Sequence, residues 1–248
     1  MSSSLLISIV LPTYNGARNG ITYLDESVQS CIAQTYTNWE LIIVDDCSND
    51  LKTAARADFW AARDSRIRVL HNSVNRKLPA SLNIGFSQAR GDLLTWTSDD
   101  NRYLPNALEV MERTLREQQS TDLVYAGYTL IDEKGVQGAQ VVARPIEDLW
   151  MTSVVGACFL YRRRLHEALN GYDENLFLAE DYDFWLRASC RFTMKPMAEV
   201  LYEYRYHSGA LTHTHRAQTS VPSDQALARN LSQMVWMSKS SRIEAYLR

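Results

Sequence analysis

The amino-acid sequence predicts an α/β protein in which helices cover both faces of a mostly parallel sheet. Two observations support this prediction. In the first half of the chain, short runs rich in Val, Ile and Leu alternate with segments of helical periodicity. The runs are continuous in apolar residues, as is typical of strands that are buried on both faces. With 248 residues, the chain is long enough for one large domain.

The first half repeats a strand–turn–helix pattern. The first strand is expected at residues 6–11, where Pro12 ends the apolar run. Thr22 is expected to cap a helix in which Leu24, Val28 and Ile32 recur at four-residue spacing on one face. Further strands are expected at residues 41–44, 67–70 and 92–97, and further helices at 51–63 and 78–89.

The second half is less regular, and its last helix is basic. From Arg205 to Arg248 the chain carries six Lys or Arg against two Asp or Glu. The apolar stripe of the final helix is open to three interpretations: peripheral membrane contact, a homodimer, or packing on the domain's own flank, which we favour. The expected elements are a helix at 105–117, a strand at 123–131, a buried run at 154–161, a helix at 182–188, a strand at 199–206 and a helix at 224–248.

Composition narrows the class of protein. The net charge of -3 argues against a nucleic-acid partner, which would require a basic surface. The four cysteines form no C-x-x-C pair, which favours reduced thiols in a cytoplasmic protein. The first residues lack the basic segment of a secretory signal, and no apolar run approaches the roughly 18 residues of a membrane span. We therefore expect a cytoplasmic protein, soluble or peripheral on the inner membrane face.

Polar residues follow three of the expected strands and indicate where a ligand would bind. They are residues 12–15, Asp45–Asp46 and Asp99–Asp100. In open α/β sheets, ligands bind at the carboxyl ends of the strands. Four carboxylates gathered there would repel one another unless cations or hydrogen-bond donors compensate. The glycine-rich phosphate-binding motifs G-x-G-x-x-G and G-x-x-x-x-G-K-[ST] are absent from the sequence.

Six short motifs in order carry a resemblance to a known family. They are I-V-L-P-T-Y-N at 9–15, W-E-L-I-I-V-D-D-C-S at 39–48, N-I-G at 83–85, S-D-D at 98–100, A-E-D-Y-D at 179–183 and Y-R-Y-H at 204–207. Together they resemble family 2 glycosyltransferases with the GT-A fold. The resemblance implies a Rossmann-like GT-A domain at residues 1–215, with a nucleotide-binding half of about 1–102 and an acceptor-binding half of about 103–215. A C-terminal helical extension at 216–248 would serve acceptor binding or dimerisation.

The resemblance implies a nucleotide pocket. Asp45 would accept a hydrogen bond from a uracil ring N–H, and Tyr14 would pack on the base or ribose. Arg76, with Lys77, would contact the diphosphate, although a solvated basic loop is an alternative. Asp45 has an alternative role as the cap of the following helix, because Asp is a favoured cap residue. The complete set is Pro12, Thr13, Tyr14, Asn15, Asp45, Arg76, Asn83, Ser98 and Asp100.

A metal site is also implied. Asp99 matches the last acid of the family's D-x-D motif, which holds a metal on the donor diphosphate, and oxygen ligands suit Mn²⁺ or Mg²⁺. This sequence has Thr97 at the first acidic position, so the site would depend on Asp99, with Asp100 as a second contact. His207 matches a histidine that completes the site in many relatives. The alternatives are a turn before a helix for the two aspartates and a structural role for the histidine.

Asp181 matches the catalytic base of the family. Inversion in a single displacement requires one base to take the proton of the acceptor hydroxyl. Glu180 would hold the acceptor or tune Asp181 through its like charge. Trp185 is a candidate to stack on an acceptor sugar, although core packing is the interpretation that we favour for a single tryptophan. The two acids have a further alternative role, since carboxylates favour a helix N-terminus.

The function that the resemblance implies is metal-dependent, inverting glycosyl transfer. We expect a hexose or N-acetylhexosamine to move from a UDP-linked donor to a hydroxyl of a glycan or lipid-linked acceptor, in surface polysaccharide biosynthesis. A catalytically degenerate nucleotide-sugar-binding protein is the alternative that Thr97 keeps open. A nucleotidyltransferase is disfavoured, because the first strand leads into P-T-Y-N and not into a glycine-rich, basic loop.

Overall fold

The first half of the chain forms the parallel part of a sheet. The computed structural model describes residues 4–16, 23–211 and 221–231. The first elements are β1 (Ile7–Thr13), α1 (Tyr23–Ile32), β2 (Trp39–Asp45), α2 (Leu51–Ala61), β3 (Ile67–His71), α3 (Lys77–Ser87) and β4 (Leu93–Trp96). β1 pairs with β2 and β4, and β2 pairs with β3, all in parallel. The expected alternation is confirmed, while the proposed cap Thr22 lies outside the described residues.

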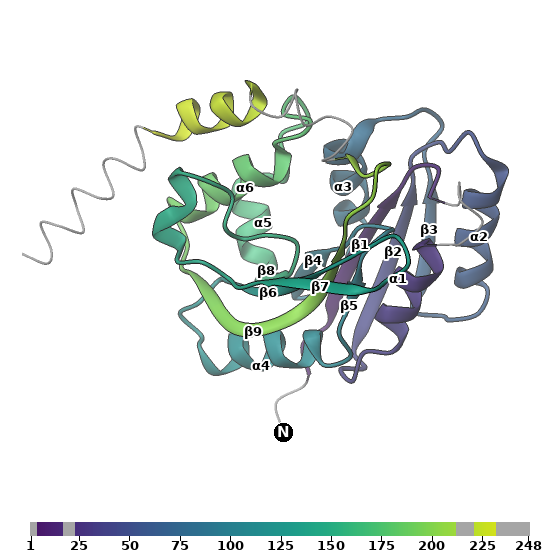
Figure 1. Ribbon diagram of the computed structural model, residues 1–248, viewed down its shortest axis with the longest axis horizontal. Coiled ribbons are helices and arrows are strands. Elements are labelled where there is room, and N and C mark those ends of the chain that lie inside the picture. The colour runs from purple at the N-terminus through teal and green to yellow at the C-terminus, as the bar shows by residue number, and fades with distance from the viewer. Residues whose placement is uncertain (1–3, 17–22, 212–220, 232–248) are drawn as a thin grey trace, which may run out of the picture.

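The second half extends the same sheet with strands of both directions. Its elements are β5 (Arg102–Tyr103), α4 (Ala107–Glu117), β6 (Leu123–Ile131), β7 (Gln137–Val141), the 3-10 helix η1 (Ile146–Trp150), β8 (Phe159–Arg162), α5 (Arg163–Leu169), α6 (Glu180–Ser189) and β9 (Met194–Arg205). Across the described residues the strand order is β3-β2-β1-β4-β8-β6-β9-β5, with β7 on β6. β4–β8, β6–β8, β6–β7 and β5–β9 are antiparallel, whereas β6–β9 is parallel. The α/β fold predicted from the sequence is confirmed (Figure 1).

Several second-half elements differ from the sequence prediction. β5, β7, η1 and α5 were not expected, and β9 begins five residues before the expected 199–206. β7 escapes hydrophobic patterning because four of its five residues are exposed. Only the last three residues of the buried run 154–161 belong to β8, since Gly156 (φ +65°) lies in a turn before the strand. A short apolar run in the sequence therefore does not distinguish a strand from a packed loop.

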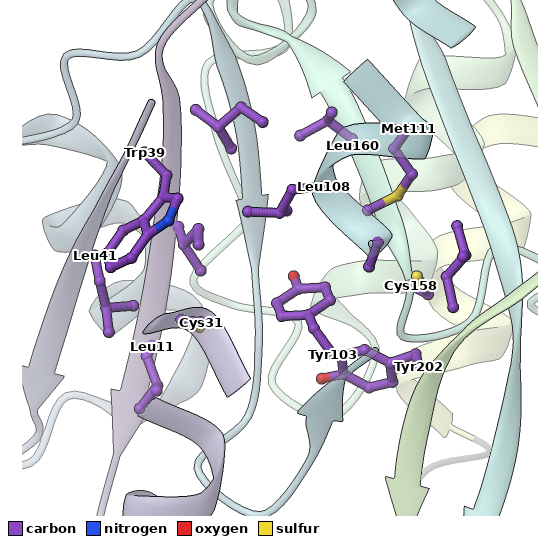
Figure 2. Close-up of a cluster of buried hydrophobic side chains, with 14 of the residues drawn as sticks. Leu11, Cys31, Trp39, Leu41, Tyr103, Leu108, Met111, Cys158, Leu160 and Tyr202 are labelled. Atoms are coloured by element: carbon purple, nitrogen blue, oxygen red, sulfur yellow. The ribbon is translucent and has the colours of Figure 1, made fainter. Parts of the chain in front are cut away.

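Each face of the sheet is covered by its own set of helices. Ile9 and Leu11 of β1 pack in a core with α1, α2 and α4, part of which Figure 2 shows around Trp39 and Met111. Val10, between them, points to the other face and joins a core with α3, α5 and α6. This alternation follows from the period of two in a strand. Because α3 and α6 both pack in the core that contains Val10, they lie on the same side of the sheet.

The last described helical segment, residues 221–231, packs beside α6. Ala226 is fully buried in the α6 core, and Nδ2 of Asn230 donates to Oδ1 of Asp183 at 3.4 Å. Arg229 forms an ion pair with Asp173 at 2.8 Å. This part of the helix therefore packs on the domain's own flank, as favoured from the sequence, and residues 232–248 lie outside the described chain. Among the described helices, none has the length and apolar character needed to cross a bilayer.

Candidate functional site

The carboxyl ends of three parallel strands meet at one edge of the sheet. Thr13, the last residue of β1, is in register with Asp45, the last residue of β2. The hydroxyl of Thr13 donates a hydrogen bond to Oδ2 of Asp99, three residues beyond β4. Gly16 lies against the same carboxylate, since a Cβ at this position would be 2.3 Å from Oδ2 of Asp99. Thr13 therefore lies beside both Asp45 and Asp99, which come from separate parts of the sequence.

Asp45 is a buried carboxylate with partners on two sides. Its Oδ1 accepts the backbone N–H of Ser48 at 3.1 Å, and its Oδ2 lies 3.1 Å from Nδ1 of His71 at the end of β3. Asp45 does not cap α2: the N-cap is Asp50, whose side chain accepts from the backbone N–H of Thr53. The helix-cap alternative is therefore wrong for Asp45, and its burial is not explained by capping.

Asp46 has a structural role next to this site. Its carboxylate accepts hydrogen bonds from the backbone N–H groups of Arg76 and Lys77 and from the amide of Asn72. These contacts fix the loop that leads into α3, including Lys77 in the left-handed region at φ +71°. The side chain of Arg76 is exposed at this loop. Asp46 therefore fixes the backbone from which the charged side chains of Arg76 and Lys77 extend.

The loop after β1 presents one exposed ring and one buried amide. Tyr14 is 44% exposed, and its hydroxyl accepts from Nδ2 of Asn49. Oδ1 of Asn15 accepts the backbone N–H groups of Asn49 and Asp50. Nδ2 of Asn15 is buried and has no hydrogen-bond partner within the described residues. A buried donor without a partner is costly, so this amide is suited to a polar ligand at the end of β1.

Asp99, Asp100 and His207 form one part of this sheet edge, which we call the acidic edge. Burial, together with the charge of Asp100, raises the pKa of Asp99 to about 7. Oδ2 of Asp100 lies 2.9 Å from Nε2 of His207, whose pKa is raised mainly by this hydrogen bond. Nε2 of His207 is engaged by Asp100, so this nitrogen is not directed at a separate metal position. A cation beside Asp99 would relieve the repulsion between the two carboxylates.

The donor set agrees with a metal that is shared between the protein and a ligand. No group of three or more His, Cys, Asp or Glu that could hold an ion occurs in the described part of the chain. One or two carboxylates, completed by phosphate and water oxygens, are a usual environment for Mg²⁺. Thr97 adds no ligand, because it is buried and its hydroxyl lies 2.6 Å from that of Tyr202. The residues present therefore fit an ion that binds together with a diphosphate.

A second pair of acids begins α6. Glu180 is buried, its Oε2 accepts the backbone N–H of Leu178, and burial with the charge of Asp181 raises its pKa to about 8. Asp181 is half-buried, its Oδ1 accepts the N–H of Tyr182, and burial raises its pKa. Both lie in the first turn of α6, where carboxylates favour the helix. The pair is therefore poised to hold or accept a proton.

Trp96 and Tyr172 connect α6 with the end of β4. Nε1 of Trp96, the last residue of β4, donates to the hydroxyl of Tyr172 at 3.0 Å. Burial raises the pKa of Tyr172, and the charges of Asp181 and Glu180 add to this effect. The acids of α6 thus lie close enough to act on a ring that contacts β4. Trp96, three residues before Asp99, and α6 therefore lie on the same side of the sheet.

Three predicted site residues have other contacts in the structure. Trp185 is fully buried against Phe159 and Phe184, so direct stacking on an acceptor sugar is wrong for this residue. The amide of Asn83 bonds to the backbone of Tyr172 at both its nitrogen and its oxygen, so it ties α3 to the segment before α6. Ser98 accepts the hydroxyl of Ser27 at its carbonyl and is half-buried.

Sequence reasoning missed His71, Gly16 and Tyr172. The histidine belongs to none of the recognised motifs, but it is the last residue of β3, and the parallel register of β2 and β3 pairs it with Asp45. Gly16 follows directly after P-T-Y-N, and a glycine next to a polar loop is a signal for close approach of other atoms. Tyr172 shows no signal apart from its aromatic side chain.

Sequence comparison identifies the family of the chain. Residues 8–169 match the model of glycosyl transferase family 2. The chain is 32% identical over 216 residues to the glycosyltransferase EpsE of Bacillus subtilis (strain 168), covering 85% of this chain and 76% of EpsE. It is 31% identical over 194 residues to the colanic acid biosynthesis glycosyl transferase WcaA of Escherichia coli (strain K12), covering 75% of this chain and 67% of WcaA.

Solved structures share the fold at lower sequence identity. TarS 1-349 of S. aureus in complex with UDP has a TM-score of 0.68 at 19% identity, over 91% of this chain and 70% of TarS 1-349. The mannosyltransferase PcManGT from Pyrobaculum calidifontis, in complex with GDP-Man and Mn²⁺, has a TM-score of 0.71 at 18% identity, over 92% and 65% of the two chains. Both similarities support the GT-A fold. The chain therefore belongs to glycosyl transferase family 2.

Proposed function

We propose that this chain transfers a sugar from UDP to a hydroxyl of a glycan or lipid-linked acceptor, with inversion at the anomeric carbon. One observation carries the proposal. Asp99 and Asp100 are adjacent acids at the carboxyl edge of the sheet, and the pKa of Asp99 is raised to about 7. A desolvated carboxylate pair is unfavourable unless a cation or a proton compensates. A metal-bound diphosphate meets that requirement.

The nucleoside would bind between β1 and β2. Tyr14 is exposed at the end of β1 and offers a ring face to the base or ribose. Asp45 offers a carboxylate to a base N–H, and Nδ2 of Asn15 offers a buried donor. Arg76, exposed in the loop before α3, is available for the diphosphate. Of the solved structures that share this fold, TarS 1-349 is in complex with UDP and PcManGT with GDP-Man, so the identity of the base is a point for experiment.

Asp99, with Asp100, would hold Mn²⁺ or Mg²⁺. The bound ion would neutralise negative charge on the diphosphate as it departs. Thr13 holds Oδ2 of Asp99 through its hydroxyl, and His207 holds Oδ2 of Asp100. These two contacts fix the carboxylates before the donor binds. Preorganisation of this kind reduces the reorganisation needed during the reaction.

Asp181 would act as the base. The acceptor oxygen attacks the anomeric carbon, its proton passes to the Asp181 carboxylate, and the bond from that carbon to the diphosphate oxygen breaks. Burial raises the pKa of Asp181, which strengthens it as a base when ionised. Glu180, with a pKa of about 8, keeps its proton at neutral pH and would avoid a second negative charge beside the base.

The acceptor would bind near η1. Trp150 is 55% exposed, and the preceding residue, Leu149, accepts a hydrogen bond at its carbonyl from the hydroxyl of Tyr182. Tyr182 directly follows Asp181, so this contact ties η1 to the start of α6. An exposed indole is suited to stacking on a sugar ring. The kinship with WcaA supports an acceptor in polysaccharide biosynthesis.

Release of free nucleotide from UDP-sugars and GDP-mannose, measured with Mn²⁺, with Mg²⁺ and with chelator, tests the proposal. We expect metal-dependent release from a UDP-sugar and its loss in Asp99→Ala. Binding of UDP without any release or transfer, with every donor and acceptor tried, would favour the alternative of a degenerate nucleotide-sugar-binding protein. The hydroxyl of Thr97 lies 2.6 Å from that of Tyr202, so a metal would depend on Asp99 and Asp100, and the loss of release in Asp99→Ala tests this directly.

A further inference from the structure

His71 bridges two carboxylates at the edge of the sheet. Its Nδ1 lies 3.1 Å from Oδ2 of Asp45 on β2, and its Nε2 lies 3.0 Å from Oδ1 of Asp58 on α2. The side chain of Asp45 is 5% exposed and that of Asp58 is 61% exposed. The imidazole therefore has a buried acid on one side and a solvated acid on the other.

The orientation of Asp45 depends on this histidine. Within the described residues, its carboxylate has two hydrogen-bond partners, the backbone N–H of Ser48 and the ring of His71. A single donor leaves a carboxylate free to turn about its last bond, whereas donors to both oxygens fix its plane. Burial opposes protonation of His71, but the hydrogen bonds to Asp58 and Asp45 outweigh it and raise its pKa. Protonation favours donation from both ring nitrogens.

We propose that His71 is a positioning residue for base recognition: it orients the Asp45 carboxylate so that this group accepts the N3–H of uracil. The inference rests on the proposed function, because it assumes that a nucleotide base binds beside Asp45. His71 acts through Asp45 and does not contact the donor. Asp58 holds the opposite ring nitrogen and thereby sets the rotation of the imidazole. Partners that orient a binding group in this way are a general feature of precise sites.

The test compares UDP with UDP methylated at N3, which lacks the hydrogen-bond donor that Asp45 would recognise. Binding of both compounds is measured by calorimetry in the presence of Mn²⁺. The wild-type chain is expected to bind UDP about tenfold more tightly than the methylated compound, because methylation leaves a buried carboxylate without its partner. In His71→Ala, UDP affinity is expected to fall about tenfold, and the methylation penalty to shrink to about twofold.

His71→Asn provides the rescue, since its side-chain N–H can occupy the place of Nδ1. It is expected to restore UDP affinity to within about threefold of wild type. With a UDP-sugar, His71→Ala is expected to raise the donor KM while kcat stays within about twofold, because Asp181 and the acidic edge are unchanged. Asp64→Asn is the matched control: this acid pairs with Arg66 before the start of β3 and should leave UDP affinity unaltered.

Two results would overturn the assignment while leaving the proposed function intact. The first is equal UDP affinity in wild type and His71→Ala. The second is an equal loss for UDP and its methylated form in His71→Ala, which would make His71 a general structural residue. A wild-type chain that binds no UDP in the presence of Mn²⁺ would overturn both this inference and the proposed donor.

Discussion

The hydroxyl of Thr13 donates a hydrogen bond to Oδ2 of Asp99, joining residues that are 86 positions apart in sequence. The contact links the end of β1 to the segment after β4, and it holds one oxygen of the acid expected to bind metal. The geometry of the acidic edge is therefore determined by the loop after β1 as well as by the aspartates themselves.

Gly16→Ala should impair metal-dependent donor binding without unfolding the protein. The added methyl group would lie 2.3 Å from Oδ2 of Asp99 and 2.7 Å from the hydroxyl of Thr13. The carboxylate can swing away, so the cost falls on the position of the metal ligand. We expect UDP affinity with Mn²⁺ to fall by on the order of tenfold, since a displaced ligand weakens a site that has one or two carboxylates.

Gly138→Ala is the matched control for this substitution. A Cβ at Gly138 would meet one backbone oxygen at 3.5 Å, an ordinary contact. Calorimetry with UDP and thermal unfolding of both variants would measure the effect. If Gly16→Ala binds UDP and Mn²⁺ as wild type does, the close approach of Gly16 to Asp99 has no bearing on the metal site.

Asp181→Asn should abolish transfer while retaining the donor. The amide oxygen can still accept the backbone N–H of Tyr182, which the carboxylate accepts in the structure, so local geometry is preserved. Loss of a general base typically reduces the rate by about 10²–10⁴-fold. Transfer rates and UDP affinity should be measured on the same preparation. Wild-type turnover in this variant would remove Asp181 from the mechanism.

The parallel half of the fold could be predicted because its signal is local. β1 and β2 are rich in Val, Ile and Leu, and all seven residues of β2 are buried. The carboxyl ends of parallel strands meet at one edge, which is why Asp45, at the end of β2, and Asp99, after β4, could be placed together from sequence. The antiparallel half lacks this signal: β7 is mainly exposed, and β5 has two residues. Its pairing depends on contacts between distant segments.

The site residues divide in the same way. Asp99 and Asp181 belong to recognisable motifs, whereas His71 lies outside them and gains its place from the register of β3 on β2 and from its contact with Asp58 on α2. Trp185 is the opposite case: its place beside the two acids made it a candidate for sugar stacking, but its position in α6 directs it into the core, as favoured for a single tryptophan. The face of a helix on which a side chain lies decides its role, and the motif alone did not specify it.

Glu180→Gln should stabilise the protein at alkaline pH. Burial and Asp181 raise the pKa of Glu180 from 4.5 to about 8, so the folded protein holds this proton more tightly than the unfolded chain does. Protonated Glu180 therefore contributes to the free energy of unfolding. This contribution is fully present below about pH 4.5 and is lost as the pH rises towards 8. Glutamine is neutral at every pH, and its amide oxygen can accept the N–H of Leu178 in place of the carboxyl oxygen.

Urea unfolding at pH 6 and pH 9 measures this effect. Relative to wild type, the free energy of unfolding of Glu180→Gln should increase by on the order of 1–3 kcal/mol between the two pH values. Glu167→Gln, at a side chain that is 65% exposed, serves as the control and should show no such change. A constant difference between Glu180→Gln and wild type at both pH values would contradict the burial of an ionisable Glu180.

Trp150→Ala should weaken acceptor binding without affecting the donor. The indole is 55% exposed on η1, and the Tyr182–Leu149 hydrogen bond at 2.8 Å ties η1 to the helix that carries Asp181. Loss of a stacked aromatic ring costs about 0.5–1.5 kcal/mol beyond the area it buries, so the acceptor KM should rise about three- to tenfold. Trp150→Phe keeps a ring face and should recover most of this loss, whereas Val142→Ala, at another exposed apolar residue, should have no effect.

Transfer to a panel of simple glycosides gives the acceptor KM, and hydrolysis of the UDP-sugar in the absence of acceptor reports on the donor site. An unchanged acceptor KM in Trp150→Ala, for every glycoside that the wild-type chain uses, would place the acceptor away from η1.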